Sequence, residues 1–102
     1  MRSIVQKEWD RCFICGRCDQ ALDVHHCFGG ALRKKSEHYG LKVHLCHNSC
    51  HIDGAFAVHK NRNIDLGVKR FAQKAAMKKY GWNEDQWRKE FYKSYLEDNN
   101  NG

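Results

Sequence analysis

The C-terminal part of the chain carries hydrophobic residues at helical spacing. They form one apolar stripe within residues 64–81, made of Ile64, Val68, Phe71, Ala72 and Ala75. The opposite side is basic and carries Lys69, Arg70, Lys74, Lys78 and Lys79. Asp65 is the only acidic residue of this segment. We therefore predict an amphipathic helix with a basic outer face, which ends at Gly81.

A second helix is predicted to begin near Asn83, because asparagine is a favourable N-cap and two acidic residues follow it. Three aromatic residues then recur at four-residue intervals on one side: Trp87, Phe91 and Tyr95. Together with Trp82 and Tyr92, we expect them to pack this helix onto the rest of the protein. Residues 99–102 are expected to form a frayed tail.

The N-terminal half contains shorter alternating runs. Residues 21–28 predict a strand with Leu22 and Val24 facing the core. Residues 41–46 predict a second strand, whose inner face carries Leu41, Val43 and Leu45. Between them, residues 29–36 (GGALRKKS) indicate a flexible, basic connection. Two strands and two C-terminal helices predict a small α+β fold.

Composition limits the classes of protein to consider. A chain of 102 residues predicts a single domain, residues 1–102, with a thin hydrophobic core. Lys and Arg number 18 against 12 Asp and Glu, and the net charge of +6 favours a polyanionic partner. The sequence contains no run of ~18 apolar residues, which a membrane-spanning helix would need. The first residues also lack a signal-peptide pattern. We therefore expect a cytoplasmic protein with no membrane partner.

All six cysteines and all seven histidines lie between Cys12 and His59. In a reducing compartment such thiols are more often metal ligands than disulfides. Cys12 and Cys15 form a C-x2-C-G turn, and Cys46 and Cys50 follow about thirty residues later. These four thiols predict a closed site for a structural Zn²⁺ that joins the N-terminus to the second strand.

The ligand set of this zinc site has alternatives. Cys18 forms a competing C-x2-C pair with Cys15, and His47 or His51 can replace a cysteine. Cys27 is expected to be a bystander, because it falls on the opposite face of its strand from the apolar residues. The alternative to a zinc site is a set of free, buried thiols.

Four histidines remain of interest once the four cysteines are assigned: His25, His26, His51 and His59. Adjacent histidines point to opposite faces of an ideal strand, so His25 and His26 can share a site only where the strand ends. Eight residues of straight helix span ~12 Å, which would keep His51 and His59 apart. The Asp53-Gly54 pair is a break signal that lets the chain fold back. We interpret the four imidazoles as a second, separate metal site.

Several motifs occur in a characteristic order: the run 24–41 (VHHCFGGALRKKSEHYGL), then Leu45-Cys46, then His51, then 58–61 (VHKN). In this order they resemble the small phage nucleases of the HNH, or His-Me finger, superfamily. Among these, the chain is similar to phage proteins grouped with the recombination-enhancement nucleases, over roughly residues 12–80. The resemblance implies a ββα-metal core around one divalent cation, with a four-cysteine zinc beside it. Residues 12–60 would form this zinc-stapled core and 61–98 a C-terminal helical extension.

The resemblance also implies an activity, the metal-dependent hydrolysis of phosphodiester bonds in DNA. In the family, the second of two adjacent positions at the end of the first strand is the general base, here His26. The first binds the metal, here His25, and the later metal positions fall on His51 and His59. The implied cofactors are the structural Zn²⁺ and a catalytic Mg²⁺, Mn²⁺, Ni²⁺ or Zn²⁺. The implied partners are DNA and a recombinase or another phage DNA-processing protein.

The sequence departs from the family pattern in two places. The family's central asparagine, which braces the general base, has no counterpart where Gly40 and Leu41 stand. The candidate replacements are Ser36, Tyr39 and a backbone carbonyl. Residues 46–50 also form a turn one residue longer than usual, which leaves open whether Cys50 or His51 completes the zinc site. In the second case only two histidines would remain for the catalytic metal.

Six basic residues are predicted to approach DNA phosphates: Arg33, Lys34, Lys35, Lys69, Arg70 and Lys74. Their alternative role is to keep exposed surfaces solvated. Two further hypotheses compete with the nuclease. One is a non-catalytic, zinc-stapled DNA-binding protein, and the other is a recombination accessory protein that binds its partner through the aromatic helix. The role of His26 separates the enzyme from both.

Overall fold

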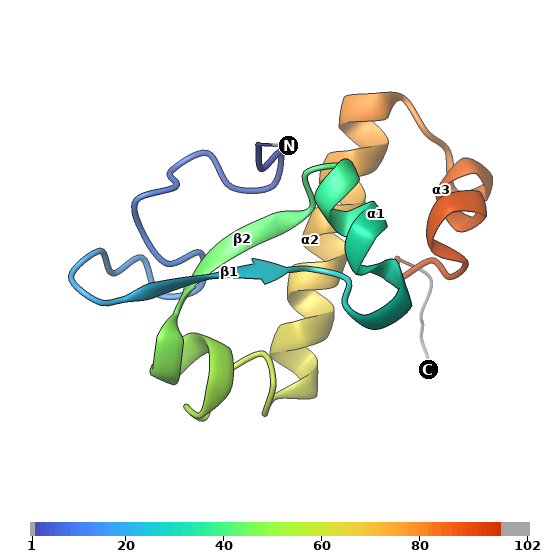
Figure 1. Cartoon of the computed structure of the whole chain (residues 1–102). Helices are drawn as coiled ribbons and strands as arrows, with labels where there is room; N and C mark the ends of the chain where they lie inside the picture. Colours follow the sequence, from blue (N-terminus) through green and yellow to red (C-terminus); the bar gives the residue numbers. More distant parts are fainter. Residues whose placement is uncertain (1, 97–102) are drawn as a thin grey trace.

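Two short antiparallel strands form the sheet of this protein. The computed structural model describes residues 2–96, so the predicted tail at 99–102 lies outside the described residues. Strands β1 (Leu22–His26) and β2 (Lys42–Cys46) pair along their whole lengths. Helix α2 crosses behind them, and α3 lies beside α2 (Figure 1). The molecule is thus a small, compact α+β domain.

The faces of the sheet follow the predicted alternation in β2 but not in β1. Val43 and Leu45 are fully buried, and so is Leu41 just before the strand. The prediction is wrong for Val24, which is 47% exposed, whereas His25 beside it is buried. In β1 the strand therefore turns its histidine, rather than its valine, toward the interior.

The connection between the strands is helical, so the prediction of a flexible loop is wrong. It contains the 3-10 turn η1 (Gly30–Leu32) and helix α1 (Arg33–His38). Ser36 on α1 is fully buried. Its hydroxyl donates to the carbonyl of Leu41 at 2.5 Å and accepts from the backbone N–H of Phe28 at 3.3 Å. These bonds fix α1 against the end of one strand and the start of the other.

Helix α2 (Arg62–Tyr80) is the longest element and begins and ends as its sequence predicts. The Asn61 side chain accepts from the N–H of Ile64, and Gly81 adopts a left-handed conformation with φ of 69°. Its buried side is narrow and consists of Val68, Ala72, Gln73 and Ala76. Phe71 was expected on this side but is 53% exposed.

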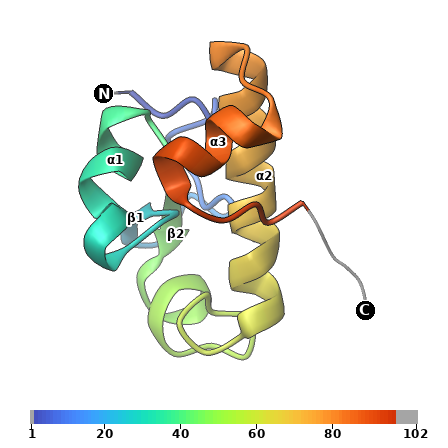
Figure 2. The ribbon, with the colours of Figure 1, turned by 90° about the vertical axis from the view of Figure 1, so that its right-hand side faces the viewer.

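Helix α3 (Glu84–Phe91) lies against α2, as the turned view shows (Figure 2). It begins with a capping box, in which Asn83 and Gln86 exchange hydrogen bonds of 2.8 Å. Trp87 and Phe91 are buried, and both rings contact Phe28. The predicted packing of these two aromatic residues onto the rest of the protein is therefore confirmed.

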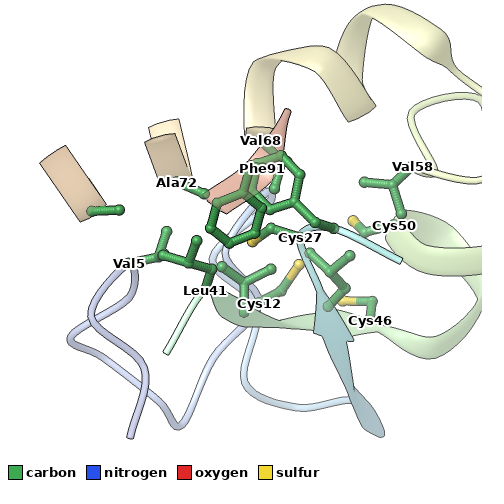
Figure 3. Close-up of a cluster of buried hydrophobic side chains, with 14 of the residues drawn as sticks. Val5, Cys12, Cys27, Leu41, Cys46, Cys50, Val58, Val68, Ala72 and Phe91 are labelled. Carbon is green, nitrogen blue, oxygen red and sulfur yellow. The ribbon is translucent and has the colours of Figure 1, made fainter. Parts of the chain in front are cut away.

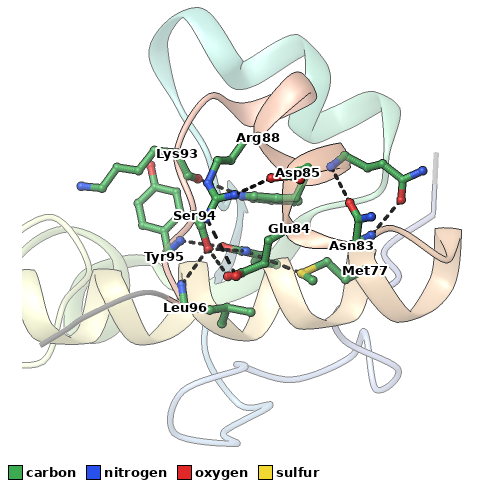
Figure 4. A network of polar contacts seen from close by, with 12 residues as sticks. Met77, Asn83, Glu84, Asp85, Arg88, Lys93, Ser94, Tyr95 and Leu96 are labelled. Atoms are coloured by element: carbon green, nitrogen blue, oxygen red, sulfur yellow. Dashed lines mark hydrogen bonds and ion pairs between the residues drawn. The ribbon is translucent and has the colours of Figure 1, made fainter.

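The segment after α3 leaves the helix earlier than predicted. Tyr92 has a φ of 70°, which ends the helix, and its side chain is 71% exposed rather than packed. Ser94 accepts from Gln73 of α2 and donates to Glu84, while Gln73 also accepts from the N–H of Tyr95 (Figure 4). This network, rather than a continued helix, holds the C-terminal segment to α2.

One cluster of buried side chains extends from Val5 to Phe91 and includes several cysteines (Figure 3). Cys12, Cys46 and Cys50 lie in it beside aliphatic residues, so part of the interior is made of sulfur. Within residues 2–96, no helix combines the length and the apolar character needed to cross a membrane.

Candidate functional site

Four cysteine thiols from three parts of the chain meet beside the sheet. Cys12 and Cys15 come from the N-terminal segment, Cys46 ends β2, and Cys50 lies in the π-helical turn η2 (His47–Ile52). Their Sγ atoms all lie within 4.8 Å of one another, with 3.5 Å between those of Cys15 and Cys46. A tetrahedral Zn²⁺ with bonds of about 2.3 Å spaces its sulfurs about 3.8 Å apart. The cluster is therefore compatible with a structural zinc.

The ionisation of these thiols also favours a cation. Burial opposes the thiolate of Cys12, but N–H groups of Cys15, Cys46 and Ile14 outweigh it and lower its pKa to about 7. Burial raises the pKa of Cys46 to about 11 and that of Cys50 to about 12. Several thiolates can therefore coexist here only when a positive ion compensates their charge.

The geometry decides among the alternative zinc ligands that the sequence leaves open. Cys50 points to the thiols, whereas the next residue, His51, belongs to a cluster of imidazoles. Cys18 is exposed and stands outside the four-thiol cluster. Cys27 is buried elsewhere in the core, where burial raises its pKa to about 12. His47 hydrogen-bonds Asp23 instead of joining the thiols.

Three imidazoles form a second cluster: His25 of β1, His51 of η2 and His59 of the loop before α2. One ring nitrogen of each lies within 4.8 Å of the others. The Nε2 atoms of His51 and His59 are 3.1 Å apart, close to the spacing of two nitrogen ligands on one first-row cation, about 3.0–3.4 Å. Nε2 of His25 is buried and has no hydrogen-bond partner among the described residues.

A tight fold-back of the chain brings His51 and His59 together. The N–H of His59 donates to the carbonyl of His51, and both Asp53 and Gly54 donate to the carbonyl of Asn48. Gly54 lies directly on the backbone of Ser49, where a Cβ atom would come within 2.1 Å of the carbonyl oxygen. The glycine is therefore required by the close approach of two backbone segments.

His25 is held in its neutral form. Burial, and the neighbouring His51 and His59, lower its pKa to about 4. At neutral pH the ring therefore carries a lone pair on one nitrogen and no net charge. An uncharged imidazole whose buried nitrogen has no other partner is what a metal ion requires.

Asp23 orients the second imidazole of the cluster. Its Oδ2 accepts from Nδ1 of His51 at 2.9 Å and from Nδ1 of His47 at 2.6 Å. The bond from His51, followed by that from His47, lowers the pKa of Asp23. With its proton held on Nδ1, neutral His51 presents the lone pair of Nε2 to the cluster. Sequence reasoning missed Asp23, although it stands two residues before His25 and so shares its face of β1.

His26 ends β1 and lies against a carboxylate. Its Nε2 is 2.8 Å from Oε1 of Glu37 on α1. Bonds from His26 and then from Lys42 lower the pKa of Glu37 to about 2, so the carboxylate is charged. The prediction that Ser36 or Tyr39 holds His26 in place is wrong. Ser36 instead bonds Phe28 and Leu41, and the Tyr39 hydroxyl bonds Glu90. Glu37 is a partner that sequence reasoning did not find.

A cavity of about 720 Å³ joins the histidines to part of the predicted basic surface. Its lining includes all four predicted histidines and two of the six basic residues, Arg33 and Lys69. Lys34, Lys35, Arg70 and Lys74 are not part of the lining. Lys35 instead bonds the carbonyl of Glu90 on α3, and Arg70 bonds that of Tyr95. Only two of the six residues therefore line the histidine cavity.

Comparison with family models, with curated proteins and with solved structures finds no match to this chain. The class of site is therefore defined by its geometry. The protein is a small α+β domain with a four-thiol cluster compatible with structural zinc. Beside it, three imidazoles and a carboxylate-bonded histidine line one open cavity.

Proposed function

We propose that this protein is a metal-dependent endonuclease or nicking nuclease that hydrolyses phosphodiester bonds in DNA. In this proposal β1, β2 and α2 form the ββα-metal core of an HNH nuclease. The observation that carries it is the convergence of three metal-competent imidazole nitrogens in the cavity that His26 also lines. Imidazole ligands suit Zn²⁺ and Ni²⁺ among the cations that the resemblance implies.

His26 is the general base of the proposed reaction. Because Nε2 donates its proton to Glu37, the neutral ring carries its lone pair on Nδ1. Nδ1 makes no hydrogen bond within residues 2–96, so it can accept a proton from water. Glu37 also stabilises the imidazolium that forms, because it is charged and is held in place by Lys42.

The other groups of the cavity bind and orient the substrate. His25, His51 and His59 would hold the divalent cation. When bound, such a cation supplies positive charge that stabilises the developing charge on the phosphate and its leaving oxygen. Arg33 and Lys69 line the same cavity and attract the phosphate backbone, although Lys69 also pairs with Asp65 at 2.9 Å.

A plasmid-nicking assay with Mg²⁺, Mn²⁺, Ni²⁺ and Zn²⁺ tests the proposal. We expect His26→Ala to slow nicking by about 10²- to 10⁴-fold, which is the usual contribution of a general base. His38→Ala is the matched control, because His38 is exposed on α1 and lies outside the cavity lining. Both variants should keep the zinc content and melting temperature of the parent.

Two outcomes would overturn the nuclease proposal. One is a wild-type protein that cleaves DNA with none of these ions, and the other is a His26→Ala variant as active as His38→Ala. Retained, salt-sensitive DNA binding in the first case would favour the non-catalytic, zinc-stapled DNA-binding protein.

A further inference from the structure

The N-terminal segment forms a fixed platform along β2 (Figure 1). Ser3 donates to the carbonyl of Lys42 at 2.6 Å and accepts from the N–H groups of Val5 and Gln6. The buried Gln6 side chain accepts from the N–H of His44 at 2.8 Å and donates to two carbonyls of its own segment. This part of the chain is therefore held at several points rather than lying loosely on the surface.

The platform positions Trp9 at the outer face of the sheet. Its indole stacks on the ring of His44, with centroids 3.7 Å apart and planes at 28°. Its carbonyl also bonds Nδ1 of the same histidine at 2.5 Å. The side chain nevertheless remains 36% exposed. A large aromatic ring is thus immobilised without being buried.

A second cavity of about 690 Å³ opens beside this indole. It is lined by Arg2, Ser3, Gln6, Lys7, Trp9 and Lys42. Lys42 already pairs with Glu37, but Arg2 and Lys7 are exposed and make no ion pair among the described residues. No carboxylate belongs to this lining within residues 2–96. The cavity therefore offers positive charge and an aromatic surface to an anionic, planar ligand.

The second cavity and part of the histidine cavity lie on the same face of the strand pair. Val24 and His26, which line the histidine cavity, pair with His44 and Lys42 and share their face of the sheet. His44 carries the stacked Trp9, and Lys42 lines the second cavity. A polymer bound at the histidines would therefore meet Trp9 and its basic neighbours next.

We propose that Arg2, Lys7 and Trp9 bind an unpaired DNA strand next to the phosphodiester group that is cleaved. The two cations contact phosphates, and the indole stacks on the face of a base. A base inside a duplex has no free face, because its neighbours in the stack cover both sides. The position relative to cleavage rests on the proposed nuclease function, but the binding itself does not. The proposal names a substrate class, DNA with a single-stranded segment.

Fluorescence anisotropy with a full-length His26→Ala protein tests the proposal without cleavage. The probes are a labelled single strand, a blunt duplex and a duplex with a single-stranded overhang. We expect Trp9→Ala to weaken binding of the single strand about tenfold, as the loss of one stacked base does. Trp9→Phe should retain most of the affinity, and blunt-duplex binding should change less than about twofold.

Matched charge variants test the cations. Arg2→Gln/Lys7→Gln and Lys78→Gln/Lys79→Gln both remove two charges, but the second pair lies on exposed positions of α2 away from both cavities. We expect only the first pair to reduce the salt dependence of single-strand binding, by about 1.4 in log–log slope. Equal effects of the two pairs would overturn the assignment of the cations.

Two further results would overturn the stacking site. One is a Trp9→Ala variant that binds the single strand as tightly as Trp9→Phe does. The other is a Trp9→Ala variant that loses as much affinity for the blunt duplex as for the single strand. Failure of the nuclease proposal is distinguishable, because Trp9-dependent binding with no nicking by wild-type protein leaves this strand-binding site standing. Nicking by the wild-type protein, together with single-strand binding that does not depend on Trp9, would support the nuclease proposal and overturn the stacking site.

Discussion

The thiol cluster and the imidazole cluster are neighbours in the chain and in space, yet they are built in opposite ways. Cys50 and His51 are consecutive residues of η2, and each serves a different cluster. Three of the four thiols are buried among core side chains. The imidazoles instead line a cavity. The enclosed thiols are compatible with a structural zinc, whereas the proposed function needs the imidazoles to be open to a substrate.

The two clusters also differ in how their ligands are supported. Backbone N–H groups of Cys15, Cys46 and Ile14 act on the thiol of Cys12, so this cluster is supported by the main chain. The imidazoles depend on distant side chains, as Asp23 of β1 orients His51 of η2. A change at one cluster should therefore affect folding, whereas a change at the other should affect chemistry.

The largest expected effect is on folding, and it should follow replacement of a cysteine of the thiol cluster but not of a histidine of the imidazole cluster. Cys46→Ser should abolish zinc binding and cooperative folding, because structural zinc contributes about 10–16 kcal/mol in small zinc-finger peptides. His59→Ala should keep the structural zinc and a cooperative transition. Elemental analysis of bound zinc and thermal melts followed by circular dichroism measure both effects. A Cys46→Ser variant that melts like the parent would contradict a structural role for the thiols.

A smaller effect on stability is expected from a change in the backbone fold-back that follows Cys50 and His51. Gly54→Ala should destabilise the protein by about 1–3 kcal/mol, because the new methyl group would overlap the carbonyl of Ser49. The same change should weaken metal binding by the histidines, since this fold-back joins His51 to His59. Denaturant unfolding and Ni²⁺ titration provide the measurements.

Gly67→Ala is the matched control for this backbone change. Gly67 is exposed in α2, and a Cβ atom there meets nothing within 4 Å. Helix propensity predicts a gain of about 1 kcal/mol from the added methyl group. If Gly54→Ala and Gly67→Ala shift stability in the same direction, the close approach at Ser49 does not matter.

The smallest perturbation is chemical modification of the cysteines. With zinc bound, iodoacetamide should react first at the exposed Cys18, because zinc engages four thiols and burial raises the pKa of Cys27 to about 12. All six cysteines should react after chelation and denaturation. Peptide mass spectrometry identifies the modified sites. Early modification of Cys12 or Cys50 would show that these thiols are not engaged by a metal.

Much of the fold could be predicted because its signals are local. The stop of α2 at Gly81 and the cap of α3 at Asn83 follow from the conformational preferences of single residues. The helix α1 escaped prediction because the glycines before it and its basic residues resemble a loop, and the hydrogen bonds of Ser36 to Phe28 and Leu41, which flank the two strands, come from tertiary packing. Val24 and Phe71 show the same limit, since periodicity assigns a face but not what covers it.

The sequence by itself determined where the two C-terminal helices begin, the buried face of β2 and the close spacing within each cysteine pair, because each depends on residues near one another in the chain. Tertiary structure alone decided that Cys50 and not His51 joins the thiols, and that Asp23 and Glu37 bond the histidines. It also placed Trp9 on His44. Such contacts join residues 11 to 35 positions apart, and spacing along a chain cannot specify the directions from which they arrive.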